Sequence, residues 1–222
     1  EKEHILLSSE ELAEWINRTK IHVIHCTPSL FKLFNTNSSK NFYRSLRYIF
    51  LAGEQIPVPV LAEWFQTHSN HVQIINLYGP TETTLAKLYY RIHPSDIETS
   101  NKIPIGKPLP GCQVLLVDTN LHQVPDGTAG EILLQTPFMS KGYYNNPLLN
   151  SEKFITHPFD KEFSGLVYRT GDLAYKRPDG NYVFLGRKDR QIKIRGMRIE
   201  PSEIESILVQ HPLIEECAVI AR

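Results

Sequence analysis

The stretch Val72-Gln73-Ile74-Ile75-Asn76-Leu77-Tyr78-Gly79-Pro80-Thr81-Glu82-Thr83-Thr84 changes from apolar to polar at a glycine–proline pair. Its first half, 72–77, predicts a buried strand, and Gly79-Pro80 predicts the turn that ends it. The polar residues therefore follow the carboxyl end of a strand, where open α/β sheets bind ligands. Threonine hydroxyls can donate to phosphate oxygens, and a lone glutamate suits Mg²⁺, which takes one or two carboxylates plus substrate oxygens. A polar turn that caps a following helix is an equally open interpretation at this point.

The residues upstream predict alternating strands and helices. Apolar runs at 21–24 and 46–51 predict two more buried strands, and 57–65 predicts a helix that begins at a proline. Strands separated by helices of this length are typical of parallel β-α units. We therefore expect residues 1–86 to form an α/β unit.

The next segment, 87–188, is richer in prolines and glycines. Short strand-like runs at 114–117 and 131–134 alternate with turn signals, and Pro178-Asp179-Gly180 predicts a hairpin turn. Short strands divided by frequent turns favour a small antiparallel sheet or a distorted barrel.

The last segment, 189–222, forms a third unit with an unusual charge pattern. Six basic residues and one acid lie within 187–198, and five glutamates without any lysine or arginine lie within 200–216. The pattern predicts an amphipathic strand at 192–194, a helix from residue 200, and a strand at 217–220. The predicted buried stripe of that helix consists of Ile204, Ile207 and Leu208. Because a domain should not stop on a bare buried strand, we expect an incomplete unit.

Composition excludes several classes of protein. The 24 basic and 24 acidic residues cancel, which argues against nucleic acid or membrane as a partner. No apolar run reaches the ~20 residues of a membrane-spanning helix, and no signal-peptide pattern opens the chain. Cys26, Cys112 and Cys217 have no paired spacing, so we expect neither a zinc site nor a disulfide framework, and we expect a cytoplasmic location.

Two further side chains are candidate ligand contacts. Asp172 ends a strand-like run, where a carboxylate can accept both hydroxyls of a ribose, although an aspartate that caps a turn is the simpler interpretation. Arg187 could hold an anion, or belong to a solvated basic strand that the glutamates neutralise. Neither a Walker-type glycine loop nor a GxGxxG sequence is present, and Tyr143-Tyr144 is interpreted as packing.

Four motifs occur together in order along the chain. They are NLYGPTETT (76–84), GEILLQTPFMSKGYYNNP (130–147), YRTGDL (168–173) and GRKDRQIKIRGMRIEPSEIE (186–205). Over residues 20–222 the sequence closely resembles the adenylation domains of nonribosomal peptide synthetases, in the adenylate-forming superfamily that includes acyl-CoA synthetases and luciferases. The resemblance implies an α/β adenylate-forming fold: the later part of the large subdomain, with parallel α/β and small β-barrel parts, and the start of the small C-terminal lid subdomain.

The resemblance also implies a reaction and its partners. An amino acid or related carboxylic acid attacks the α-phosphate of ATP, with Mg²⁺, and the acyl group then passes to the phosphopantetheine of a peptidyl carrier domain. Neighbouring synthetase domains, and either an inserted domain after residue 220 or a small accessory protein, are further implied partners.

Site residues follow by position within the motifs. The resemblance assigns Thr81, Glu82 and Arg187 to catalysis, with Glu82 as the Mg²⁺ ligand, and Asp189 to the hinge of the lid. The implied nucleotide contacts are Ala52, Gly53, Asn76, Tyr78, Thr81, Asp172, Phe184 and Arg187. Tyr78 is expected to stack on adenine, and Phe184 stands where many members have tyrosine. The implied substrate pocket consists of His25, Phe50, Ala52, Leu77, Leu85 and Ala86.

Parts of the family pattern are not in this sequence. The Ser/Thr/Gly-rich phosphate loop, the aspartate that pairs with the substrate amino group, and the lysine near the domain's end all fall outside it. We therefore expect the isolated chain to be inactive. The alternatives are a relative of acyl- or aryl-CoA ligases and a non-catalytic scaffold domain.

Overall fold

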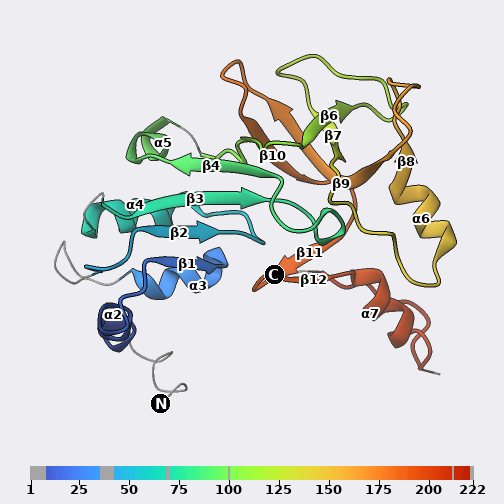
Figure 1. Cartoon of the computed structure of the whole chain (residues 1–222). Coiled ribbons are helices and arrows are strands. Elements are labelled where there is room, and N and C mark those ends of the chain that lie inside the picture. Colours follow the sequence, from blue (N-terminus) through green and yellow to red (C-terminus); the bar gives the residue numbers. More distant parts are fainter. Residues whose placement is uncertain (1–8, 36–42, 69–70, 100, 212, 221–222) are drawn as a thin grey trace.

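The computed structural model describes residues 9–35, 43–68, 71–99, 101–211 and 213–220. A five-stranded sheet carries the first part of the chain (Figure 1). Its strands lie side by side in the order β1 (Val23–Cys26), β2 (Tyr48–Leu51), β3 (Gln73–Tyr78), β4 (Leu88–Ile92) and β5 (Lys107–Pro108). The first three are parallel, as the βα alternation predicts, whereas β4 and β5 are antiparallel additions.

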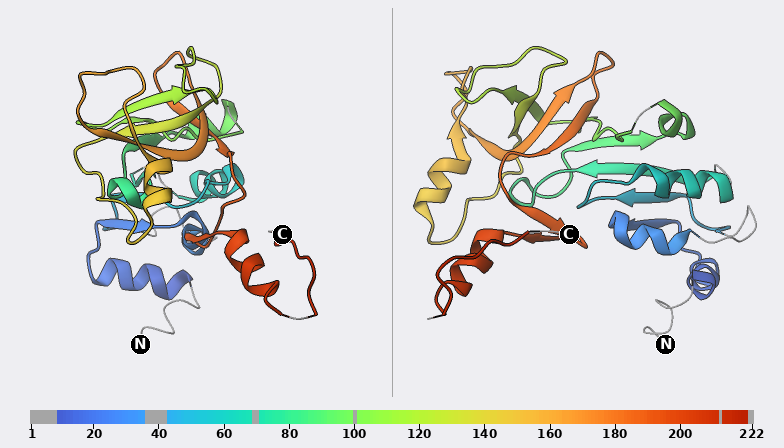
Figure 2. Two further views of the ribbon diagram at one scale, coloured as in Figure 1. Left: turned by 90° about the vertical axis from the view of Figure 1, so that its right-hand side faces the viewer. Right: turned by 180° about the vertical axis from the view of Figure 1, so that it is seen from behind.

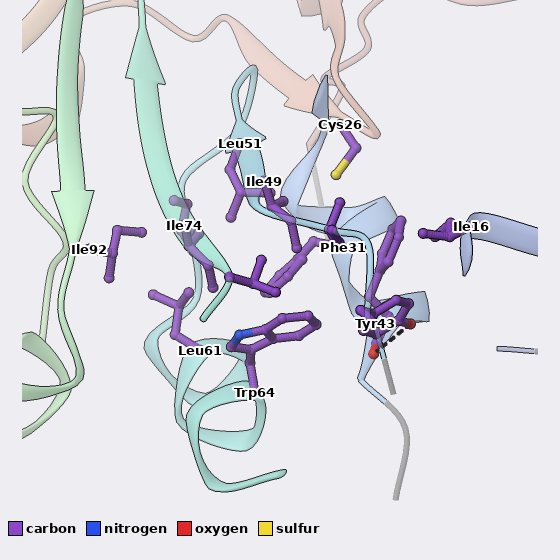
Figure 3. Close-up of a cluster of buried hydrophobic side chains, with 14 of the residues drawn as sticks. Ile16, Cys26, Phe31, Tyr43, Ile49, Leu51, Leu61, Trp64, Ile74 and Ile92 are labelled. Atoms are coloured by element: carbon purple, nitrogen blue, oxygen red, sulfur yellow. Dashed lines mark hydrogen bonds between the residues drawn. The ribbon is translucent and has the colours of Figure 1, made fainter. Parts of the chain in front are cut away.

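Helices supply the core beside this sheet. They are α2 (Ser9–Arg18), α3 (Pro28–Phe31) with its 3₁₀ continuation η1 (Lys32–Phe34), α4 (Val58–Thr67) and α5 (Pro94–Thr99). Trp64 of α4 is fully buried, with its ring centroid 5.2 Å from that of Phe31 and 5.7 Å from that of Tyr43 (Figure 3). Each such buried side chain stabilises the fold by about 1.5–3 kcal/mol, so this cluster fixes the sheet that carries the polar turn.

The second sheet is entirely antiparallel. Its path is β10 (Tyr182–Arg187), β9 (Leu166–Lys176), β7 (Gly130–Gln135) and β6 (Gln113–Val117), and β8 (Phe154–Thr156) pairs with β9. Helix α6 (Pro147–Lys153) precedes β8, and its cap Asn146 accepts a hydrogen bond from the Leu149 amide.

Backbone hydrogen bonds at Tyr182 join the two sheets. The Tyr182 amide donates to the Gly106 carbonyl at 2.8 Å, and the Ile105 amide donates to the Tyr182 carbonyl at 2.9 Å. The expected division at residue 86 falls just before β4, which is hydrogen-bonded to β3, so the first sheet extends to residue 108. We call the described residues up to 187 the body.

The described residues from 188 to 220 form an arm. It holds a two-stranded hairpin, β11 (Ile192–Ile194) with β12 (Met197–Ile199), and α7 (Pro201–Leu208). Figures 1 and 2 show α7 beyond the edges of both sheets.

Two predictions for the arm are wrong. The stripe of α7 is not buried: Ile204, Ile207 and Leu208 are 40%, 69% and 38% exposed, because no described layer covers that face. Residues 217–220 form no strand, because side chains, and not a neighbouring strand, form hydrogen bonds with the backbone there. The Val219 amide donates to the Glu205 carboxylate at 2.7 Å, and its carbonyl accepts from Arg190 at 3.1 Å.

Across the described residues, none of the helices has the length and apolar character that crossing a bilayer requires.

Candidate functional site

A cavity of about 460 Å³ opens where the carboxyl ends of β2 and β3 face the end of β10. This is within the usual size range for small-molecule sites. Of the residues that the sequence singled out, the cavity is lined by Gly53, Asn76, Leu77, Tyr78, Asp172, Phe184, Arg187 and Asp189. Residues almost a hundred positions apart are thus brought together by the contact between the two sheets.

Asp172 lies on one wall of the cavity and is only 7% exposed. The Tyr78 hydroxyl donates to its Oδ2 at 2.5 Å, and Arg187 Nη1 donates to its Oδ1 at 2.7 Å. Burial raises the pKa of Asp172, and the hydrogen bond from Tyr78 and the Arg187 charge offset that only in part. Because an ionised carboxylate offers about four lone-pair directions, each oxygen keeps acceptor capacity for a ligand.

Arg187 ties this wall to the start of the arm. Its Nε and Nη2 donate to both carboxylate oxygens of Asp189, at 2.6 and 2.5 Å, and its Nη1 also donates to the Thr170 carbonyl at 3.1 Å. Gly171 leaves the room for this guanidinium, since a Cβ there would lie 2.8 Å from Nη2 of Arg187. The arginine is therefore held in one orientation between two carboxylates.

The polar turn after β3 is wound tightly. A Cβ at Gly79 would lie 2.1 Å from the Leu85 carbonyl oxygen, so only glycine fits there. The Lys87 amide closes the loop on the Tyr78 carbonyl at 2.7 Å. Thr84 and Leu85 both have left-handed φ values, 59° and 56°, which are uncommon for side-chain-bearing residues and recur at functional sites.

Glu82 lies in the single 3₁₀ turn η2 (Thr81–Thr83) and is 7% exposed. Its Oε1 accepts from the Tyr143 hydroxyl at 2.5 Å and from Arg198 Nη1 at 2.6 Å. Its Oε2 is buried without any hydrogen-bond partner. Burial acts to raise the pKa of Glu82, but the hydrogen bonds from Tyr143, the backbone and Arg198 together hold it below its usual value.

An orphaned carboxylate oxygen fits a hard cation. Buried polar atoms normally have partners, and an exception needs an explanation, of which a bound ion is one. Among the described residues, no three His, Cys, Asp or Glu side chains gather into a metal cluster. A single carboxylate is nevertheless enough for Mg²⁺, which completes its shell with substrate oxygens and water.

The remaining expected residues lie outside the cavity. Thr81 is exposed beside Glu82, and Ala52, which directly follows β2, does not line the space. In the expected substrate pocket only Leu77 lines it, while Leu85 is 68% exposed. The other pocket members, on β1, β2 and the turn, are His25, Phe50 and Ala86.

Sequence reasoning missed three contacts at this site. Arg198 reaches Glu82 from the arm, and Glu54 Oε1 accepts from the Gly196 amide at 2.6 Å. Tyr143 contacts Glu82 through its hydroxyl, and Tyr144, expected to pack, is 93% exposed. Tyr143 and Arg198 both lie within the long motifs, so their position there was the available signal.

The comparisons with known proteins agree with this arrangement. Residues 1–144 match the family model described as AMP-binding enzyme. The chain belongs to the AMP-binding enzyme family. The expected recognition, part of an adenylation domain, is confirmed by this match and by the relatives below.

Two similar sequences are those of a bacitracin synthase and a tyrocidine synthase. The chain is 42% identical to bacitracin synthase 3 of Bacillus licheniformis over 224 residues, covering 100% of the chain and 3% of that protein. It is 40% identical to tyrocidine synthase 3 of Brevibacillus parabrevis, covering 92% of the chain and again 3% of that protein. The chain thus spans a small part of these relatives.

Solved structures confirm the expected adenylate-forming fold. The holo form of PA1221, an NRPS protein containing adenylation and PCP domains and bound to a vinylsulfonamide inhibitor, superposes with a TM-score of 0.86 at 28% identity, covering 97% of this chain and 37% of that one. The fused adenylation–PCP protein NpsA-ThdA from Klebsiella oxytoca gives 0.78 at 28% identity, covering 92% and 37%.

Proposed function

We propose that this chain forms the nucleotide-binding part of an adenylation domain that activates an amino acid, or a related carboxylic acid, with ATP in nonribosomal peptide synthesis. The observation that carries the proposal is the cavity wall on which Tyr78 and Arg187 orient the buried carboxylate of Asp172. The identities to bacitracin and tyrocidine synthases support the same pathway class.

Each wall of the cavity offers a different contact to the nucleotide. Asp172 accepts the ribose hydroxyls on the lone pairs that Tyr78 and Arg187 leave open. The side-chain amide N–H of Asn76 donates to the Pro104 carbonyl at 2.8 Å. This leaves the side-chain oxygen of Asn76 as an acceptor for the adenine amino group. Phe184 lies with its ring centroid 6.5 Å from that of Tyr78, and the two rings form an apolar wall for the base.

The phosphates are assigned to the turn after β3. Glu82 would hold Mg²⁺ through Oε2, and Thr81, exposed beside it, would donate to a phosphate oxygen. When bound, the ion would neutralise charge that develops on the phosphates as the carboxylate attacks the α-phosphate and pyrophosphate leaves. Arg187 adds a fixed positive charge to the wall of the cavity that holds Asp172, and preorganised charges and donors of this kind stabilise transition states.

Asp189 is proposed as the hinge of the arm. It lies two residues after Arg187, and its carboxylate accepts the Gln191 amide at 3.1 Å, so the chain turns at this residue. The loop that contains Gly196 would approach a phosphopantetheine arm after rotation about the hinge. Lid motions of this kind often limit turnover.

The partners follow from the same proposal. They are the acid substrate, a peptidyl carrier domain with its phosphopantetheine, and neighbouring synthetase domains, with an inserted domain or accessory protein as a further option. The solved neighbours that pair adenylation and PCP domains support the carrier domain. The three free thiols support a cytoplasmic location.

The proposal is tested by ATP–pyrophosphate exchange in the full-length synthetase across a panel of amino, hydroxy and keto acids. Exchange with one acid establishes the chemistry and identifies the substrate. Asp172→Asn should raise the KM for ATP at least about tenfold, the usual scale for a lost charged hydrogen bond, whereas Asp126→Asn, on the exposed Lys176 pair, should not change it. Absence of exchange with every acid, in folded protein, would favour the scaffold alternative.

A second measurement compares the isolated chain with the full-length synthetase. The isolated 222-residue chain should show no exchange, because the phosphate loop and the lysine of the family pattern lie outside its sequence. Robust turnover by the pure chain would overturn that part of the proposal.

A further inference from the structure

The two oxygens of the Glu82 carboxylate are in different situations. Oε1 accepts two hydrogen bonds, whereas Oε2 is buried and accepts none. A carboxylate that can rotate would exchange these roles. Something must therefore hold the group with Oε1 toward its donors and Oε2 away from them.

The donor within the body is Tyr143. Its hydroxyl lies 2.5 Å from Oε1 of Glu82 and 3.1 Å from the hydroxyl of Tyr168, which is 2% exposed. Tyr168 comes from β9, so the carboxylate ends a chain of hydroxyls that starts inside the second sheet. Chains of hydrogen bonds polarise and strengthen one another in a low-dielectric interior.

Tyr143 is itself held from both sides of its backbone. The Asn150 side chain accepts from the Tyr143 amide at 2.6 Å and donates to the Tyr143 carbonyl at 2.9 Å. Gly142 makes this approach possible, since a Cβ there would lie 2.6 Å from Oδ1 of Asn150. The tyrosine ring also packs edge-on against Phe154, with the ring centroids 5.8 Å apart.

The loop before Tyr143 is hydrogen-bonded to the turn that carries Glu82. The Ser140 amide donates to the Glu82 carbonyl at 2.8 Å, and the Thr84 hydroxyl donates to the Phe138 carbonyl at 2.8 Å. The spacing between the tyrosine and the glutamate is therefore set by backbone contacts as well as by their own hydrogen bond.

The second donor, Arg198, belongs to the arm and would leave when the arm rotates. We infer that Tyr143 is a positioning residue for the metal carboxylate: its hydroxyl, supported by Tyr168, keeps Oε1 occupied and Oε2 directed toward the cation. This rests on the proposed function, in which Glu82 binds Mg²⁺. Residues that orient metal ligands in this way typically change metal affinity 10–100-fold when they are mutated.

The experiment uses the full-length synthetase with Mn²⁺ as the probe. Free Mn²⁺ is measured by electron paramagnetic resonance in the presence of a non-hydrolysable ATP analogue, and the KM for ATP is measured separately at saturating Mg²⁺. Tyr143→Phe should weaken Mn²⁺ binding by about 10-fold or more, with the KM for ATP at saturating Mg²⁺ nearly unchanged. Tyr168→Phe should weaken it less, and Tyr144→Phe, the exposed neighbour, should leave it unchanged.

The outcomes distinguish the positioning role of Tyr143 from the proposed function on which it rests. Wild-type Mn²⁺ affinity in folded Tyr143→Phe would overturn the positioning role while leaving the proposed function intact. Wild-type protein that binds no Mn²⁺ beyond the analogue itself would overturn both. Since the phenylalanine keeps the ring that packs on Phe154, a merely structural role for Tyr143 predicts no change in metal affinity.

Discussion

The body and the arm are held in place by different forces. The body contains three clusters of buried apolar side chains, the largest of them around Trp64 and Phe31. Among the described residues of the arm only Gln191 and Pro201 are buried. Its contacts with the body at Glu54 and Glu82 are hydrogen bonds to carboxylates. Exposed ionic contacts are screened by salt, so we expect the contacts of the arm with the body to be more sensitive to salt than the apolar core of the body.

The largest expected effect on stability comes from creating a cavity in the apolar core of the body. Trp64→Ala should lower the free energy of unfolding by about 3–5 kcal/mol, because a fully buried indole leaves a cavity among Phe31 and Tyr43. Ile207→Ala, 69% exposed on α7, should change it by less than about 0.5 kcal/mol. Chemical denaturation of both variants measures the contrast, and equal effects would mean that the arm shares the body's core.

The sequence predicted the body better than the arm for the same physical reason. Buried strands and their helices carry a periodic apolar pattern, and β2 and β3 lie within a residue or two of the predicted runs. The pattern of Ile204, Ile207 and Leu208 is equally amphipathic, but no periodicity tells whether a covering layer is present.

For the candidate site too, one part could be predicted from the sequence and another could not. The tightly wound turn after β3 could be recognised from Gly79-Pro80 and the residues that follow it. The partners of Glu82 could not, because Tyr143 and Arg198 are 61 and 116 positions away and meet it only through the tertiary fold. The apolar pocket residues were taken from the resemblance, and of the six only Leu77 lines the described cavity. The other five, His25, Phe50, Ala52, Leu85 and Ala86, do not.

An intermediate effect is expected at the ion pair between β7 and β9. Arg169 donates to both oxygens of Glu131, at 3.3 and 2.8 Å, and the Glu131 side chain is 5% exposed. Arg169→Met leaves this carboxylate buried beside Lys188 at 3.5 Å, and should cost about 2–3 kcal/mol of unfolding free energy. Denaturation at neutral pH measures it, and a loss below about 0.5 kcal/mol would contradict the pairing.

The same pair predicts a pH dependence. Burial acts to raise the pKa of Glu131, but Arg169 and Lys188 hold it below its usual value. A depressed pKa in the folded state means that the stabilisation is complete above the unfolded-state pKa of about 4.3 and is lost as the pH falls through the lower folded-state pKa. The unfolding free energy should therefore drop below about pH 4, and drop less steeply in Glu131→Gln. Parallel pH profiles of the two proteins would contradict this assignment.

Substitution of Arg198 should have the smallest effect on stability and the clearest effect on the attachment of the arm to the body. Because this side chain is 41% exposed, Arg198→Ala should cost less than about 1 kcal/mol. It should nevertheless speed limited proteolysis between residues 188 and 196, and added salt should do the same to the wild type. Arg195→Ala removes the same charge from an exposed position and serves as the control. A cleavage rate that neither Arg198→Ala nor salt changes would mean that other contacts hold the arm.

The central claim, a persistent nucleotide-binding body with an arm that moves about Asp189, is tested most directly by a distance across the hinge. Fluorophores encoded at the exposed positions Gln66 on α4 and Glu203 on α7 report that distance in single molecules of the full-length synthetase. The account predicts two populations whose ratio shifts when a non-hydrolysable ATP analogue, Mg²⁺ and the acid are added, and shifts again in Arg198→Ala. One distance, unchanged by nucleotide, salt or the mutation, would contradict it.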